Sequence, residues 1–264
     1  MIEAHYGTTA DGLLAARIDC LVYVAVPVKG GFRIATAYRP VRPLEEVTKD
    51  CAYGCEAVVA DDAGFRSHID GVLDDARERE ALNRRQTDMA PWTPWGPSQS
   101  ATRYAEGIIC YTTAGHGGFI LDPERNALVS PALRLPDGCY EEDCDWSRVA
   151  AAFPALFTAR EKTAADKILR DSFPDAWEAL YGRTLPPEES FTREREAFES
   201  RHAADWVVIV ASRSDSHPGF IVASATLGGR RNAGPARTYF IPSDEYAAGR
   251  HGFVIDPARH QQPG

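Results

Sequence analysis

The sequence predicts an α+β protein with mainly antiparallel β-hairpins and packed helices. Three stretches share one pattern: a β-branched run, a short polar turn, a Gly-Phe pair and a second apolar run. This pattern is typical of β-hairpins, because glycine supplies the positive φ that tight turns require. Segments of helical periodicity lie between these stretches. Since the strands come as hairpins and not in β-α-β order, we expect antiparallel pairing.

The hairpin pattern occurs near the start, the middle and the end of the chain. Its copies are Leu21–Ala37, Gly107–Leu121 and Trp206–Ala225, with a fainter fourth copy at Tyr239–Asp256. In each copy the Phe begins the return strand, where it can face a core. The sequence leaves two origins open, internal duplication and convergence on a common hairpin. True repeats would share turn type and sheet position.

Four segments between the hairpins have helical character. In Gly64–Gln86 the apolar residues recur at helical spacing. Asp145 is placed to cap the helix that follows it. Thr158–Tyr181 carries one apolar stripe and is interrupted at Pro174, and Pro186–Ala203 begins with the prolines and acids that suit a helix N-terminus.

These elements divide the chain into three regions. Residues 1–90 hold a hairpin and a helix, residues 91–182 a hairpin and helices, and residues 183–264 a helix and hairpins. Whether the regions pack as one compact unit is left open. Met89–Ser98 is the clearest linker, because its prolines fix an extended path.

Composition narrows the function classes. The chain of 264 residues has a formal net charge of -9, and its acidic residues are dispersed. A protein that tracks nucleic acid needs a basic stripe, so we expect no direct nucleic acid binding. No apolar run of membrane-spanning length occurs, and the first residues lack the basic and apolar segments of a signal peptide. We therefore expect a cytoplasmic protein.

The six cysteines raise the question of zinc. Two close pairs have three and four intervening residues, which falls within the range of structural zinc sites: Cys51 with Cys55, and Cys139 with Cys144. Neither pair has the sequence context of a zinc knuckle, and a reducing compartment already explains free thiols. Cys20 and Cys110 lie in apolar runs and resemble buried hydrophobic residues. The sequence contains no Walker loop, Rossmann fingerprint or HExxH motif, so we expect no metal and no cofactor.

The central region resembles an uncharacterised domain family encoded on bacterial plasmids, integrative elements and phages. The resemblance covers about residues 92–180 and rests on three phrases: Trp95-Gly96-Pro97-Ser98-Gln99, His116-Gly117-Gly118, and Tyr140-Glu141-Glu142-Asp143 followed by Trp146. It implies an accessory gene of a mobile element. Proteins in that context are often inhibitors of host defence or helpers in transfer.

One set of residues in this region could carry chemistry. His116 lies in a turn flanked by glycines, and the acids Glu141, Glu142 and Asp143 lie in a second loop. A loop histidine near carboxylates could act as a general base. The alternative is structural: His116 holds its turn by hydrogen bonds while the acids cap the following helix. The recurrence of a histidine beside a Gly-Phe turn supports that alternative.

Two functions therefore remain. The first is a non-enzymatic binding protein that docks on a host or competing-element protein complex and inhibits a host defence system. Its candidate binding residues are Trp92, Trp95, Ser98, Gln99, Arg103 and Arg134. The second is a small hydrolase or transferase that uses His116 with the acids at 141–143. Convergence of these groups at the floor of a pocket would favour the enzyme, and an exposed tryptophan would favour binding.

Overall fold

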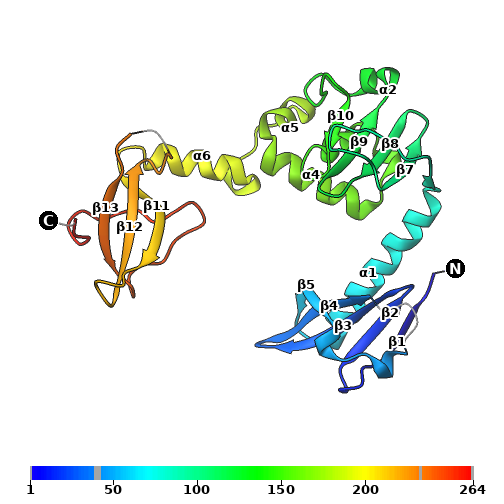
Figure 1. The fold of residues 1–264 in the computed structure, drawn as a ribbon, viewed down its shortest axis with the longest axis horizontal. Helices are drawn as coiled ribbons and strands as arrows, with labels where there is room; N and C mark the ends of the chain where they lie inside the picture. Colours follow the sequence, from blue (N-terminus) through cyan, green and yellow to red (C-terminus); the bar gives the residue numbers. More distant parts are fainter. Residues whose placement is uncertain (1, 39–42, 232–233, 263–264) are drawn as a thin grey trace. The chain divides into compact units, whose positions relative to one another are not determined.

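The computed structural model describes residues 2–38, 43–231 and 234–262, and its strands form three sheets (Figure 1). The strand pairs among these residues are all antiparallel, which confirms the predicted α+β class. The chain divides into two compact units, residues 1–165 and 166–264, with the boundary inside helix α4. The finer division at residues 90 and 182 stays a prediction.

The first sheet is a meander with a core on each face. Its strands follow the chain in the order β1 (Ala4–Thr8), β2 (Leu14–Ile18), β3 (Leu21–Val28), β4 (Gly31–Tyr38) and β5 (Tyr53–Val59). One face buries Ile34 against Phe65 and Ile69 of α1 (Asp62–Ala81). The other face packs on Leu44 and Val47, around the short 3-10 helices Leu44–Glu46 and Lys49–Cys51. Successive strand residues point to opposite faces, which is why one sheet serves two cores.

The second sheet carries the residues that the sequence marked as a site. Its order is β10-β9-β8-β7-β6, built from β6 (Arg85–Gln86), β7 (Ser100–Ala105), β8 (Ile108–Thr112), β9 (Gly117–Leu121) and β10 (Cys139–Glu141). The short helix α2 (Pro123–Leu128) lies between β9 and β10, and α3 (Trp146–Ala152) and a 3-10 turn (Pro154–Leu156) follow β10. Tyr140 is fully buried, and its hydroxyl donates to Asn126 Oδ1 at 2.7 Å. This bond fixes β10 at the edge beside β9.

The remaining elements lead to a three-stranded sheet. They are α4 (Ala159–Ser172), α5 (Pro174–Tyr181), a 3-10 turn (Pro187–Glu189), α6 (Phe191–Arg201), β11 (Trp206–Arg213), β12 (Phe220–Leu227) and β13 (Arg237–Pro242). The core of this sheet contains Ala223, Tyr239 and Ile241, all at most 1% exposed. No helix in the described ranges combines the length and apolar character that crossing a membrane requires.

Each of the four predicted helical segments contains at least one helix. Gly64–Gln86 corresponds to α1, and Pro174 separates α4 from α5 as its missing N–H requires. Ser190 caps α6 by accepting a hydrogen bond from Arg193 N. The cap at Asp145 was wrong: α3 has no side-chain cap, and the Asp145 carboxylate accepts from Arg148 Nε at 2.8 Å instead. An arginine one turn along therefore outcompetes the backbone amides for that carboxylate.

The three hairpins form where expected but differ in their turns. The loops between their strands span residues 29–30, 113–116 and 214–219, so they contain two, four and six residues. The fainter fourth copy is not a hairpin: β13 is followed by irregular chain, and Val254 forms an isolated bridge with Val207. Unequal loops in three separate sheets favour convergence on a common sequence solution over internal duplication.

Candidate functional site

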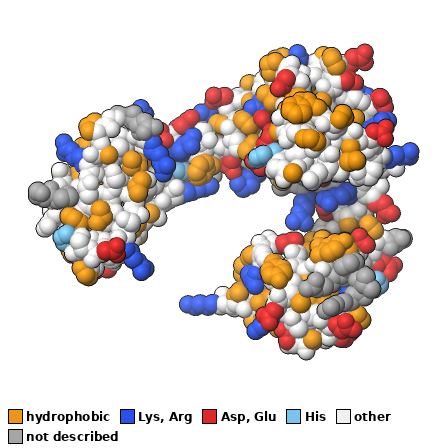
Figure 2. All heavy atoms as spheres, viewed as in Figure 1, with side chains coloured by type: hydrophobic (Ala, Val, Ile, Leu, Met, Phe, Trp, Pro, Cys, Tyr) orange, Lys and Arg blue, Asp and Glu red, His pale blue; other side chains and the backbone are white. Residues whose placement is uncertain are grey.

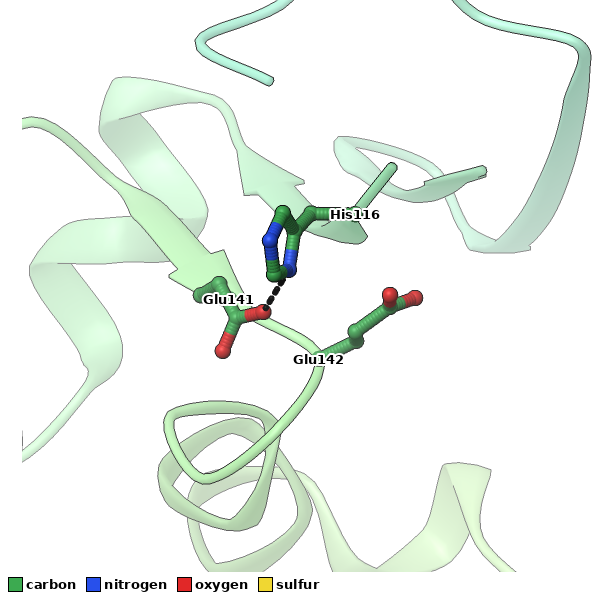
Figure 3. A group of neighbouring side chains, drawn as sticks. All are labelled: His116, Glu141 and Glu142. Carbon is green, nitrogen blue, oxygen red and sulfur yellow. Dashed lines mark hydrogen bonds and ion pairs between the residues drawn. The ribbon is translucent and has the colours of Figure 1, made fainter. Parts of the chain in front are cut away.

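Strand pairing brings His116 and two acids together although they are far apart in the sequence. β10 pairs with β9 so that Glu141 lies opposite Gly118, and Glu142 N donates to Gly117 O at 3.0 Å. The imidazole Nδ1 of His116 lies 3.3 Å from Glu141 Oε1 (Figure 3). One ligand atom of His116, one of Glu141 and one of Glu142 all lie within 4.8 Å of one another. The pairing of β9 with β10 thus brings together the histidine and two of the acids that the sequence analysis named as candidates.

The turn that carries His116 is held by a hydroxyl and not by the imidazole. Thr113 Oγ1 donates to His116 O at 2.6 Å and accepts from His116 N at 3.2 Å. Thr113 N also donates to His116 O at 2.8 Å. The imidazole itself is 62% exposed and turns toward Glu141. The hydrogen bond of the imidazole ties the turn to Glu141, and a structural role for His116 stays a prediction.

Two glycines let the acidic strand end approach the turn. A Cβ on Gly117 would lie 2.7 Å from Glu142 Oε2 and 2.5 Å from Tyr111 O. A Cβ on Gly118 would lie 2.2 Å from Tyr140 O and 2.7 Å from Trp95 Cη2. All four distances are far below van der Waals contact. The glycines of this motif are thus required by close packing between neighbouring strands.

The third predicted acid has a different place. Asp143 N donates to Glu141 Oε2 at 2.7 Å, so the backbone of Asp143 orients the Glu141 carboxylate. The Asp143 side chain is exposed and is not part of the His116 group. None of the three acids caps α3 with its side chain, so the proposed capping role was wrong.

Burial controls the thiol next to this group. Desolvation, and secondarily the charge of Glu142, raise the pKa of the Cys110 thiol to about 11. Cys110 is therefore protonated at neutral pH and is not an activated nucleophile. Burial also raises the pKa of the Cys139 thiol, with the charge of Asp137 adding to it. No ligand cluster found among the described residues includes a cysteine.

The two tryptophans of the Met89–Ser98 segment occupy contrasting positions. Trp92 is 76% exposed. Trp95 is half-buried over Gly118, and its carbonyl oxygen lies 3.3 Å from Thr113 Oγ1. Trp95 therefore supports the His116 turn, and Trp92 is free to meet another molecule.

The other predicted binding residues serve mainly to hold the fold. Ser98 Oγ donates to Ala90 O at 2.9 Å, and Gln99 N donates to Thr112 O at 2.7 Å. Arg134 donates to Val129 O and Ala127 O, each at 2.7 Å, so its guanidinium is used by loop carbonyls. Exposed Arg103 pairs with Glu106 at 3.4 Å.

Three cavities found among the described residues do not include His116, Glu141 or Glu142 in their linings. A cavity of about 620 Å³ is lined by Arg79, Arg84 and Tyr104, among others, and one of about 290 Å³ by Asn126 and Arg134. A third, of about 300 Å³, lies beside Leu82 and Phe157. His116 and the acids instead form an open surface site.

Comparison with known proteins adds a family assignment for the middle of the chain. The model of a domain of unknown function, DUF7007, matches residues 88–203. This match covers less than half of the chain. No curated protein and no solved structure matches the chain. The DUF7007 domain contains all the candidate site residues, and its start coincides with the tryptophan segment.

Thr113, whose hydroxyl bonds the backbone N and O of His116, was missed in the sequence analysis. A signal was present: a hydroxyl residue precedes the histidine by three positions both here and at Ser214-x-x-His217. Such residues commonly close local turns through side-chain to backbone hydrogen bonds.

Proposed function

We propose that this chain is a non-enzymatic accessory protein that binds a partner protein through the surface of its DUF7007 domain around Trp92. The observation that carries the proposal is the 76% exposure of Trp92 on a loop that is held in place. Tryptophan buries a large area when it binds and is enriched among residues that dominate interface energies. Exposing it to water without a partner is costly, so its position calls for an explanation.

The loop around Trp92 is braced on both sides. Thr93 is 1% exposed, and its hydroxyl donates to Gly96 O at 2.6 Å. Thr93 and Gly96 also exchange two backbone hydrogen bonds, of 2.9 and 3.0 Å. Ser98 reaches back to Ala90 O through both its backbone N and its hydroxyl. A fixed loop loses little conformational entropy on binding, which favours its use as an anchor.

The surroundings of Trp92 suit a protein partner. Met89, in the same segment, is 61% exposed, so the segment presents two large apolar side chains. On the face shown in Figure 2, acidic and basic side chains are interspersed and form no continuous basic stripe. With a net charge of -9, the chain lacks the electrostatics of a phosphate-tracking protein.

The finer form of the proposal concerns biological context. The resemblance to domains of plasmids, integrative elements and phages supports an accessory role in a mobile element. In that setting the partner is a host or competing-element complex, and the effect is inhibition of a host defence system. This context rests on association with the motifs of residues 92–180.

The test is affinity capture from bacterial host lysate with the full chain and matched variants. Trp92→Ala removes the anchor, and Leu128→Ala removes another residue of the same domain that is 67% exposed. We expect at least one protein that the wild type and Leu128→Ala retain equally. Its affinity for Trp92→Ala should fall roughly 30-fold, the change given by a loss of about 2 kcal/mol at a hot spot. Capture that is the same for all three chains would refute the proposal.

A second candidate, a small hydrolase or transferase, is favoured by the contact between His116 and Glu141. Against it, the imidazole is 62% exposed, whereas acid-base groups usually work in water-poor clefts. The half-buried Cys110 thiol, whose pKa is raised to about 11 by desolvation, supplies no activated nucleophile. Turnover of a panel of carboxyl and phosphate esters that disappears in His116→Ala would move this candidate to first place.

A further inference from the structure

We propose that His116, Glu141 and Glu142 form a surface site for one divalent transition-metal ion, with Zn²⁺ as the reference ligand. The inference goes beyond partner binding and uses different residues of the DUF7007 domain. In the sequence, only the spacing of the cysteine pairs suggested a metal, and their context argued against it. The structure instead brings together one imidazole and two carboxylates, from the turn before β9 and from the end of β10 (Figure 3).

The separation of the ligand atoms fits such an ion. His116 Nδ1 and Glu141 Oε1 are 3.3 Å apart. Two ligands at about 2.0–2.1 Å from a tetrahedral ion are also separated by about 3.3 Å. The third atom, from Glu142, belongs to a group that spans at most 4.8 Å. A rotation of the exposed Glu142 side chain would bring its carboxylate to the same ion as His116 and Glu141.

The donor types select the class of ion. Imidazole nitrogen with carboxylate oxygens is a common ligand set of zinc, and three protein ligands leave one position for water or an incoming group. Mg²⁺ and Ca²⁺ prefer sites made of oxygen alone. We therefore expect Zn²⁺ to bind more tightly than either hard cation.

Charge and orientation support the same site. In the described part of the chain, the Glu142 carboxylate has no hydrogen bond and no Lys or Arg partner among the hydrogen bonds and ion pairs found. It lies beside a second carboxylate, so a cation would relieve repulsion between the two. The hydrogen bond of 2.7 Å from Asp143 N to Glu141 Oε2 leaves Oε1 to face the imidazole. Hydrogen bonds that orient a ligand in this way are a regular feature of metal sites.

The chain also offers a matched control. His217 lies in the corresponding loop of another hairpin, and its backbone N donates to a hydroxyl three residues earlier, as His116 N does. Its Nδ1 lies 3.0 Å from Ser216 Oγ. The metal-ligand cluster found among the described residues does not include His217. His217→Ala therefore tests the loss of an exposed histidine without loss of the site.

The experiment is calorimetric titration of Zn²⁺ into the full chain without a polyhistidine tag. We expect one saturable site in the wild type and in His217→Ala. In His116→Ala and Glu142→Gln the affinity should fall at least roughly tenfold, since even a residue that only orients a ligand contributes this much. Because no hydrogen bond to the Glu142 carboxylate is found among the described residues, Glu142→Gln reports on the ligand even if His116→Ala misfolds. The titration contains no partner protein, so its outcome is independent of the proposed function.

Titration with Co²⁺ identifies the ligands. A site of His116, Glu141 and Glu142 gives only ligand-field absorption, whereas a thiolate ligand adds sulfur-to-metal charge transfer. Thiolate absorption, undiminished affinity in both variants, or no saturable site in the wild type would each overturn the proposal.

Discussion

The β8–β9 and β11–β12 hairpins start from the same local chemistry and reach different outcomes. In both, the hydroxyl of a Ser or Thr accepts the backbone N–H of a histidine three residues later, at 3.2 Å in one and 3.0 Å in the other. In both, a Gly-Phe pair begins or follows the turn. What differs is the chain opposite. His116 faces Glu141 on β10, whereas the His217 ring packs at a tilt on Phe240 of β13, with ring centroids 4.5 Å apart.

The glycines diverge in the same way. Gly118 lies within the sheet, where the backbone of β10 leaves no room for a Cβ. Gly219 lies in its loop at φ 90°, and nothing is within 4 Å of an added Cβ. The glycine of the Gly-Phe pair therefore allows close strand packing at Gly118 and a positive φ at Gly219. A repeated sequence pattern specifies the turn, and the neighbouring strand specifies the role.

The largest expected difference between the hairpins comes from these glycines. Gly118→Ala forces a Cβ to within 2.2 Å of Tyr140 O and should cost about 3 kcal/mol of local stability. Gly219→Ala meets no atom and should cost about 1 kcal/mol, from backbone strain alone. Hydrogen exchange of the β9–β10 amides and of the β11–β12 amides measures each cost separately. Equal costs would contradict the distinction between packing and conformation.

A smaller difference should follow removal of the two hydroxyls. Thr113→Val removes the group that bonds both the N and the O of His116, and we expect a loss of about 2 kcal/mol in the β8–β9 hairpin. Ser214→Ala removes the acceptor of His217 N and should cost about 1 kcal/mol in β11–β12. Urea unfolding followed by hydrogen exchange gives both values. If Thr113→Val is neutral, the hydroxyl does not hold the turn.

The comparison also shows what could be predicted from the sequence. The hairpins, their antiparallel pairing and most helix positions follow from periodicity, turn glycines and prolines, which act locally. The meeting of His116 with Glu141 and Glu142 depends on β9 pairing with β10, and no local pattern encodes that register. The Asp145 cap failed for a related reason, because Arg148 competes for the carboxylate. Local sequence patterns predict the helices and strands. Which side chains meet at the site depends on residues that are distant in the sequence.

The smallest effects should come from the histidines, and their order is informative. The His116 imidazole is 62% exposed and contacts one carboxylate, so His116→Ala should change the free energy of unfolding by less than about 0.5 kcal/mol. His217→Ala loses a ring stacked on Phe240 and should cost about 1 kcal/mol. Urea denaturation in the presence of a chelator measures both. A loss above 1 kcal/mol for His116→Ala would return this histidine to a structural role.

With Zn²⁺ at 100 times its dissociation constant, the wild type should gain about 2.7 kcal/mol that His116→Ala does not, because only the folded site binds the ion. The same residue would then be dispensable for the fold and required for the metal, which a turn brace cannot be.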